Sequence, residues 1–460
     1  MAKPVLYDVI GDSITVSNYI RNNGSQNLKN ALPVAKEDNC RLFGNILIAN
    51  TNVRNEFFSA LLNLVGTIKI TSKRYENPTA FMKKGVVEIG ASVEEVFTDL
   101  IQVYKYDPAI DQNKFWKRHL ADVRSAFHVI NYQVYYPNTI NRALIAKAFR
   151  SWSGVDDMIA SVVEAMYKSA AYDEFQCMKY MIARRINDGL MTPVEVPVLT
   201  KANMEDITIA VKEVSDQFTF MSTDYNPIGV HNYSNKEDQY LITTPKFNAN
   251  LNVEVLAAAF NMEKAEFAGH RVLIDGFGKI DLDRVKACFT DSDGNVCEGY
   301  VELSQDELDN LNKIGAMLID RDFLQWYDVL EEFTEFYNGR TIEWTYFYHL
   351  WEILSTSPFA NGVVFVPGAA TVESVSITPS EATLSVGAEI QLTVNVESNN
   401  FAPKVVNWTS DSEHATVDTN GNVKILGTAQ SAEQIVITAT AEYPASDGSY
   451  KSATCTITVA

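Results

Sequence analysis

The sequence predicts an α+β region over residues 1–369, followed by a smaller all-β region over residues 370–460. Three observations support this division. A long amphipathic helix is expected over residues 153–188, and two apolar strands are expected within residues 344–366. After Gly368 the composition changes to short runs of alternating polar and apolar residues, which are typical of a β-sandwich.

Composition places the chain among globular proteins. Hydrophobic residues make up 46% of the 460 residues and the net charge is −20, which disfavours a surface that binds nucleic acid non-specifically. No apolar run is long enough to span a membrane, and the N-terminal residues lack the apolar core of a signal peptide, so we expect a cytoplasmic origin. The five cysteines form no CxxC pair and are expected to be free thiols in a reducing compartment. No phosphate-binding loop, dinucleotide-binding motif or zinc motif occurs, and no cofactor is expected.

The first hundred residues predict one helix and one long hairpin. Residues 45–64 place Val53 and Phe57 on one face of an amphipathic helix. In residues 71–100 a turn at Pro78 and two glycines bracket apolar segments, which predicts a two-stranded hairpin with polar tips. Such a hairpin has too little apolar cover to be stable alone, so we expect it to lie against its own chain or another subunit.

The longest predicted helix covers residues 153–188. Ser153 can cap its first turn, apolar side chains recur along one side, and Arg184 and Arg185 lie in its last turns, where positive charge is favourable. Gly189 is expected to end it. At about 1.5 Å per residue the helix would be roughly 50 Å long, which is unusual for a globular domain.

The segment between residues 251 and 303 predicts mixed structure. A helix is expected from Leu251 to Phe260, and a buried strand from Arg271 to Phe277. Residues 282–303 contain two strand-like runs around Asp293-Gly294, which is a hairpin turn signal.

Two strands are expected to belong to a sheet of the α+β region, and residues 317–319 and 326–336 lead up to them. Residues 344–351 alternate with period two and carry aromatic or apolar side chains on both faces, which predicts a central strand buried on both faces. Residues 362–366 form a second short apolar strand before the chain leaves this region.

The C-terminal region predicts a β-sandwich of at least six short strands. Trp408 is expected to lie in its core, and Cys455 has no second cysteine in this region. Three lysines and ten acidic residues give residues 370–460 a net charge of −7, so the remaining −13 belongs to residues 1–369.

Several stretches resemble the major capsid proteins of phi-twenty-nine-like short-tailed phages. The most specific are Tyr-Phe-Tyr-His-Leu-Trp at residues 346–351 and Ser-Pro-Phe-Ala-Asn-Gly-Val-Val-Phe at residues 357–365. Four others match in the same order: residues 77–100, 149–190, 256–276 and 320–327. Residues 375–439 resemble the bacterial group-two immunoglobulin-like module, which is common on bacterial and phage surfaces.

The resemblance implies the Hong-Kong-ninety-seven-type fold of tailed-phage capsids and encapsulins, followed by an all-β immunoglobulin-like sandwich. In that fold residues 71–100 correspond to the extended loop that lies on a neighbouring subunit, and residues 153–188 to the spine helix. The sheet ending at Val366 corresponds to the axial domain around the centre of each capsomer. Residues 280–315 form a longer segment than this family leads us to expect.

The function that follows is that of a major capsid protein, which assembles into an icosahedral or prolate head around a double-stranded DNA genome. The expected partners are its own copies in pentamers and hexamers, a separate scaffolding protein, the portal at the head–tail connector, packaged DNA on the inner face, and head fibres; no membrane partner is expected. A separate scaffold is implied because the region before the hairpin is too short to contain one. The protein is expected in the virion after assembly in the cytoplasm of the host bacterium, with the sandwich outside the shell. The alternative is the shell of an encapsulin-like enzyme compartment, against which the terminal sandwich weighs.

Four basic residues of the hairpin, Lys73, Arg74, Lys83 and Lys84, are the candidate intersubunit contacts. Some capsids of this fold join a loop lysine to an asparagine. The sequence identifies neither the acceptor asparagine nor the catalytic glutamate that such a link needs. We therefore expect these lysines to be solvated or to form ion pairs between subunits.

One motif raises an enzymatic alternative. Residues 11–15 resemble the nucleophile block of GDSL-type esterases, and residues 411–414 spell their Asp-x-x-His motif. The blocks that would build an oxyanion hole are missing, so no enzymatic activity is expected. Ser13 is then expected to cap or turn the chain, and His414 to lie on the surface.

A second motif has the spacing of a calcium-binding loop. Its candidate ligands are Asp291, Asp293, Asn295 and Glu302. Val296 takes the place of the required glycine and the flanks are strand-like, so a hairpin turn is the expected structure.

Overall fold

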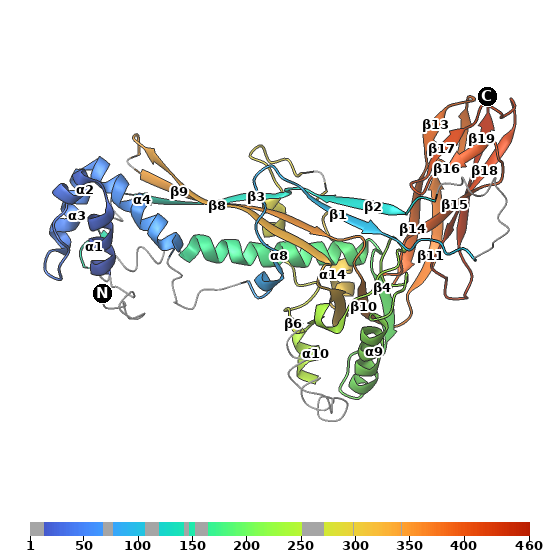
Figure 1. Cartoon of the computed structure of the whole chain (residues 1–460), viewed down its shortest axis with the longest axis horizontal. Coiled ribbons are helices and arrows are strands. Elements are labelled where there is room, and N and C mark those ends of the chain that lie inside the picture. The colour runs from blue at the N-terminus through green and yellow to red at the C-terminus, as the bar shows by residue number, and fades with distance from the viewer. Residues whose placement is uncertain are drawn as a thin grey trace.

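The molecule is elongated, with a group of N-terminal helices at one end and the C-terminal strands at the other (Figure 1). A long helix and a sheet of long strands run between the two ends, and a second α/β unit projects from one side. The computed structural model describes residues 13–67, 77–105, 119–141, 147–151, 164–250, 271–297, 299–341 and 343–460.

Four helices form the N-terminal group: α1 (Ser13–Asn23), α2 (Gln26–Ala31), α3 (Cys40–Ala49) and α4 (Thr51–Thr67). The single helix expected over residues 45–64 is wrong, because the chain becomes extended at Asn50. The Asn50 side chain accepts a hydrogen bond from the backbone N–H of Val53, 3.3 Å away, and so caps the second helix. The break lets Phe43 and Phe57, from either side of it, pack edge to face with ring centroids 5.6 Å apart.

A sheet of three long strands runs through the middle of the molecule: β3 (Tyr132–Asn141), β9 (Glu343–Thr356) and β8 (Leu324–Asn338), with β9 in the centre. The central strand expected at residues 344–351 is therefore confirmed. Trp344, Tyr346, Tyr348 and Leu350 are buried on one face, whereas the residues between them are only half-buried, so burial on both faces is partial. The N-terminal helices hold the far end of β9, where the Arg54 guanidinium lies 3.6 Å from the centre of the Trp344 ring.

Helix α8 (Ala165–Asn187) is the described part of the helix expected over residues 153–188; Ser153 lies outside the described residues. The helix ends at the predicted place, since Gly189 takes up a left-handed conformation with φ of +69°. Most of the helix is buried, including polar residues such as Asp173 and Gln176. Its surroundings explain this, because strands cover one side and the segment from residue 280 to 315 covers another.

A five-stranded sheet forms the projecting unit, in the order β4 (Thr192–Val196), β10 (Gly362–Pro367), β7 (Ala316–Asp320), β5 (Gln239–Thr243) and β6 (Arg271–Leu273). The strand expected at residues 362–366 is confirmed, whereas β6 is shorter than the strand expected over residues 271–277. Helix α9 (Met204–Gln217) covers one face and buries Ile207 and Val211. Two short helices, η4 (Lys236–Asp238) and α10 (Pro245–Asn250), flank β5, and the helix expected from Leu251 lies outside the described residues.

The segment from residue 280 to 315 differs from the expected pair of strands. It contains α13 (Leu282–Cys288) and α14 (Gln305–Leu311). Leu282, Val285 and Cys288 recur at helical spacing and pack into the main core, which explains why a helix forms there. The Asp293-Gly294 turn does form, with φ of +84° at Gly294, but it closes a single bridge between Thr290 and Val296.

The hairpin expected within residues 71–100 is also wrong in its pairing. Strand β1 (Val93–Thr98) pairs with β2 (Val123–His128), so the second strand lies beyond residue 100. The residues before β1 form the short helix η2 (Ala80–Met82) and then run along β8. There the N–H of Val87 donates to Asp328 O at 2.8 Å, and the N–H of Asp328 donates to Gly85 O at 2.9 Å.

The C-terminal region is a strand-rich sandwich, as expected. Its aliphatic core contains Ile425, Ile437 and Ile457. Trp408 packs against this core beside Gly421 but is only half-buried, so the expected tryptophan core is an aliphatic core with the tryptophan at its edge. The strands are β11 (Thr371–Thr378), β12 (Glu381–Leu384), β13 (Glu389–Gln391), β14 (Thr393–Asn399), β15 (Val406–Ser410), β16 (Ala415–Val417), β17 (Asn422–Ile425), β18 (Gln434–Ala441) and β19 (Ser452–Val459).

Candidate functional site

The two-stranded ribbon of β1 and β2 has two different faces. In its register Val96 lies opposite Ser125 and Glu94 opposite Phe127, and all four side chains are exposed. The exposed fractions are 57% for Val96 and 63% for Phe127. Leu100 and Val123 extend this outer face, which therefore presents apolar side chains to solvent.

The inner face of the ribbon is held by polar contacts with the end of β9. His128, from β2, is buried, and its Nδ1 lies 2.7 Å from Ser355 Oγ. The other ring nitrogen, Nε2, lies 3.2 Å from a carboxylate oxygen of Glu95 in β1. Ser357 Oγ donates to the second oxygen of Glu95 at 2.7 Å. Both ribbon strands are thus tied to the end of β9 at Ser355 and to Ser357 just after it.

Two more inner-face contacts continue this attachment. Phe97 stacks on Phe359 with ring centroids 5.5 Å apart and an angle of 19° between the ring planes. Asp99 Oδ1 lies 2.8 Å from His231 Nδ1. Residues 95, 97 and 99 alternate with the exposed residues 94, 96 and 98, so one strand carries both an attachment to its own chain and an exposed face on which Val96 lies between Glu94 and Thr98.

A buried ion cluster anchors the residues that lead into the ribbon. The Lys83 ammonium lies 3.0 Å from Glu174 of α8 and 2.7 Å from Asp328 of β8, and it also contacts Glu352 of β9. Glu352 is completely buried and accepts a further hydrogen bond from Trp326 Nε1 at 3.0 Å. One lysine therefore connects the ribbon's base with the spine helix and two strands of the long sheet.

The charges of this cluster depend on one another. Burial alone would lower the pKa of Lys83, but the carboxylates of Glu352, Glu174 and Asp328 outweigh burial and raise it. Burial, followed by the neighbouring charge of Glu174, raises the pKa of Glu352. Because the pKa of Lys83 is raised, its stabilising effect is complete below the ordinary lysine pKa of about 10.4 and is lost only as the pH rises through the folded-state value.

The other candidate contact residues are placed differently. Lys84 forms an ion pair with Asp322 of its own chain at 2.7 Å, and Asp322 is largely exposed. Lys73 and Arg74 lie outside the described residues. The sequence identified Lys83 and Lys84 by charge but missed their acidic partners, which come from distant parts of the chain. The sequence contained one usable signal for these partners. Glu352 is an acidic residue directly after a strand predicted to be buried, and a buried carboxylate needs a cationic partner.

The sandwich is attached to the end of the spine helix. Lys404 Nζ donates to Asn187 O at 2.9 Å and so satisfies a carbonyl of the last helical turn, where a positive charge is also favourable. A side chain at Gly189 would meet the backbone N–H of Lys404 at 2.8 Å and the carbonyl of Ala402 at 3.0 Å. Gly189 is therefore needed both for the left-handed turn and for this close approach.

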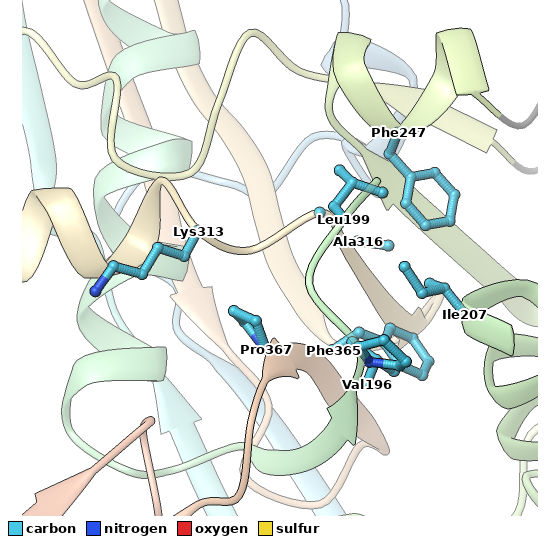
Figure 2. A pocket seen from close by; sticks show the side chains of 10 residues that line it. Val196, Leu199, Ile207, Phe247, Lys313, Ala316, Phe365 and Pro367 are labelled. Atoms are coloured by element: carbon cyan, nitrogen blue, oxygen red, sulfur yellow. The ribbon is translucent and has the colours of Figure 1, made fainter. Parts of the chain in front are cut away.

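An apolar gap between α9 and the five-stranded sheet is too small for a ligand. Leu199, Ile207, Phe247 and Phe365 surround it, with Lys313 at its rim (Figure 2). Its volume is about 10 Å³, the size of one water molecule. Within the described ranges no group of three or more His, Cys, Asp or Glu residues could hold a metal ion. No described helix is long and apolar enough to cross a membrane.

The two halves of the esterase-like motif lie far apart. Ser13 is the first residue of α1, at one end of the molecule, and His414 lies in the sandwich at the other end (Figure 1). Gly11 and Asp12 lie outside the described residues. His414 Nδ1 instead lies 2.8 Å from Glu433 of its own domain.

The residues with calcium-loop spacing form a turn. Asp291 accepts hydrogen bonds from the backbone N–H groups of Asp293 and Asn295 at 2.9 and 2.8 Å. These bonds, first of all the one from Asn295, lower the pKa of Asp291. Glu302 pairs with Lys286 at 2.9 Å.

Comparison with known families identifies this architecture. The family model described as phi29-like phage major capsid protein matches residues 17–366, and the model described as bacterial Ig-like domain (group 2) matches residues 371–451. The chain belongs to the phi29-like phage major capsid protein family. The resemblance inferred from the sequence is confirmed, and the ribbon, the spine helix and the long sheet are parts of a capsid subunit.

Curated relatives agree over most of the chain. The major capsid protein of Bacillus phage B103 is 29% identical over 444 residues, which cover 95% of this chain and 92% of that protein. The major capsid protein of Bacillus phage PZA is 28% identical over 443 residues, with the same coverage of both chains. The major capsid protein of Streptococcus phage Cp-1 is 29% identical over 327 residues, or 67% of this chain and 81% of that protein.

Solved structures show the same fold. A chain in the capsid structure of Staphylococcus phage Andhra matches with a TM-score of 0.50 and 18% identity, covering 66% of this chain and 88% of that one. A chain in the structure of the head fiber and inner core protein gp22 of native bacteriophage P68 matches with a TM-score of 0.51 and 14% identity, covering 65% and 87%. The chain therefore has a shell-forming role as a component of a phage virion, and the encapsulin-like alternative is not favoured.

Removing the ammonium of Lys83 should strongly destabilise the subunit. Lys83→Ala leaves the buried carboxylates of Glu174 and Glu352 without a cation in the interior, which is expected to lower the free energy of unfolding by about 3–5 kcal/mol. Lys84→Ala breaks the ion pair of the neighbouring lysine with the exposed Asp322. It should lower the free energy of unfolding by only about 0–1 kcal/mol. Denaturant unfolding of the unassembled subunit measures both values. Equal effects of the two substitutions would show that the cluster does not anchor the ribbon.

Proposed function

We propose that residues 1–369 act as the shell tile and that residues 370–460 form a separate domain on the outer surface. Two observations support this boundary. The two family matches end and begin on either side of Gly368, where the backbone turns with φ of +93°. The sandwich also has an aliphatic core of its own, and its net charge of −7 suits contact with solvent or a host surface more than contact with packaged DNA.

The ribbon of β1 and β2 is the proposed intersubunit contact, and we propose that its outer face makes this contact. The inner face is attached to its own chain through His128, Glu95 and Phe97, whereas Val96, Leu100, Val123 and Phe127 remain exposed on the outer face. A second copy of the chain is the proposed occupant of this face, because a shell repeats each contact in every subunit and can sum many weak ones.

The basic residues near the ribbon have different proposed roles. Lys83 and Lys84 both pair with carboxylates of their own chain, so we assign intersubunit ion pairing to Lys73 and Arg74. Such pairs would adjust the position of the ribbon on a neighbour and contribute little energy individually.

Assembly is proposed to take place in the host bacterial cytoplasm, with copies of the chain arranged as pentamers and hexamers in a closed head. The proposed further partners are a scaffolding protein, the portal, packaged double-stranded DNA on the inner face and head fibres. Membership of the capsid family and the fold of phage capsid chains support these partners. Catalysis has no place in this proposal, because the residues of the esterase-like motif lie in different parts of the molecule.

A charge on the outer face of the ribbon should block assembly. Val96→Asp should leave the subunit folded, since the side chain is 57% exposed. It should prevent closed shells, because a carboxylate without a partner is costly to bury between subunits. Val386→Asp, at a residue of the sandwich that is 44% exposed, is the matched control and should assemble normally. Electron microscopy of particles from cells that also express the scaffolding protein gives the yields, and normal yields with Val96→Asp would refute the proposed contact.

A chain that ends at Ala369 should still form closed particles with a smoother exterior. All strands of the two shell sheets precede this residue, so no central strand loses its neighbour. The particles should be less heat-stable than intact ones, because Lys404 no longer satisfies the end of α8. Microscopy and thermal melting measure the two effects. Folded monomers or aggregates, identified by circular dichroism, would show that the sandwich is required for assembly.

A serine-reactive probe should not label the protein. Ser13 and His414 lie at opposite ends of the molecule, so no base activates the hydroxyl through the esterase-like motif. Labelling in a gel assay that disappears in Ser13→Ala would contradict this expectation, and Ser13→Ala should otherwise assemble normally.

A further inference from the structure

A groove opens at one edge of the five-stranded sheet. Strands β4, β10, β5 and β6 run in the same direction, and β7 runs opposite to them. The groove is lined by the segments at the ends of the four parallel strands and by the segment that leads into β7. It therefore lies at the carboxyl ends of the parallel strands, where open α/β sheets commonly bind their ligands. Its volume is about 730 Å³, and none of the contacts proposed above uses it.

Three lysines surround this groove, and each comes from a different segment. Lys246 follows β5, Lys279 lies between β6 and α13, and Lys313 lies between α14 and β7. All three are exposed. Lys313 donates to the side chain of Asn310 at 2.7 Å, and Figure 2 shows it extending away from the apolar gap. Within the described ranges none of the three lysines forms an ion pair.

The lysine groove also has one carboxylate and several apolar side chains. The carboxylate belongs to Asp275, which pairs with the buried ammonium of Lys179 at 2.8 Å. The three other lysines therefore leave the groove with an excess of positive charge, on a chain whose net charge is −20. The apolar side chains that line it are those of Val198, Leu199, Ile314 and Pro367. Since a bare inorganic anion would not use them, the groove suits an occupant that has both carboxylates and apolar side chains.

The outer face of α9 has these complementary properties. The helix buries Ile207 and Val211 against the sheet and exposes its opposite side. Lys212 is the one basic residue of the helix, and Ile209, on the outer face, is 55% exposed. The outer face also contains four exposed acidic residues at helical spacing: Glu205, Asp206, Glu213 and Asp216. Of these, Asp216 pairs with the exposed Lys236 at 2.5 Å.

We propose that the outer face of α9 in one copy of the chain docks into the lysine groove of a second copy. The lysines then meet the carboxylates of the helix, and Ile209 packs against the apolar side chains of the groove. The helix covers one face of the sheet and the groove lies at its edge, so the two surfaces lie on different sides of the same unit. Such a contact joins copies head to tail and forms a ring when the rotation closes. This inference rests on the proposed assembly into pentamers and hexamers and assigns it a contact.

Reversing the charges of both surfaces tests the docking. Lys279→Glu with Lys313→Glu, or Asp206→Lys with Glu213→Lys, should lower the yield of closed particles about tenfold or more, because like charges then meet. All four substitutions together should restore the yield. The four residues are exposed, so each chain should stay folded, which circular dichroism checks. Lys451→Glu, at a partly exposed lysine of the sandwich, is the control and should assemble as the natural chain does.

Co-expression distinguishes a contact between copies from one within a chain. A chain with the reversed groove and a chain with the reversed helix match each other, since each unchanged surface meets its natural counterpart and each reversed surface meets the other. Together they should give more particles than either chain alone, and the purified particles should contain both chains. Electron microscopy counts the particles and mass spectrometry identifies the chains. No gain on co-expression would show that the two surfaces do not meet between copies.

Other results would also overturn the docking. Normal yields with the reversed groove would refute it, as would a folded chain with all four substitutions that stays unassembled. Normal particles with a reduced DNA content would show instead that the groove binds the phosphates of packaged DNA. The natural chain and the Lys451→Glu control report on shell formation itself, so a loss confined to the reversed chains separates this contact from the proposed function.

Discussion

The buried ammonium of Lys83 is the interaction on which the arrangement of this subunit depends. It is shared by Glu174, Asp328 and Glu352, so the residues before the ribbon, the spine helix and two strands of the long sheet all supply charge to one point. A buried charge is tolerable only when its partners are in place. The four parts must therefore assemble together, and the base of the ribbon cannot shift without leaving Glu174 and Glu352 unpaired in an apolar interior.

The ribbon combines this anchor with a free surface through the two-residue period of a strand. Glu95 and Phe97 point toward the body and pair with Ser357 and Phe359, while Val96 between them points away. A helix of similar length would spread its contacts around a cylinder and could not divide them so cleanly. The division holds the ribbon firmly on its own subunit and leaves its other face exposed to solvent, two properties that an unattached loop could not combine.

The sequence predicted the elements whose signal is local. The period-two pattern through Trp344 and Tyr348, the glycine that ends α8 and the short strands of the sandwich are all visible within a few residues. It failed where the decision is made by distant partners: strand β1 pairs with residues 123–128 and not with its immediate predecessors. The same limit applies to the site, because Lys83 was recognised as a loop lysine whereas its role follows from carboxylates about one hundred to three hundred positions away. Trp408 was assigned to a core that isoleucines fill, since the largest side chain in a region need not be the most enclosed.

The contact between the sandwich and the spine helix has a mechanical meaning. Lys404 and Ala402 sit directly on the turn at Gly189, so the sandwich is fastened to the tip of a long rigid rod in addition to its covalent connection after Gly368. A small tilt of that helix within a curved shell would move the attached sandwich by a larger distance, because the sandwich lies at the end of the long helix. The spacing between neighbouring sandwiches on a particle would then record the local curvature of the shell beneath them, and a surface ligand spanning two of them would sense where on the head it had landed.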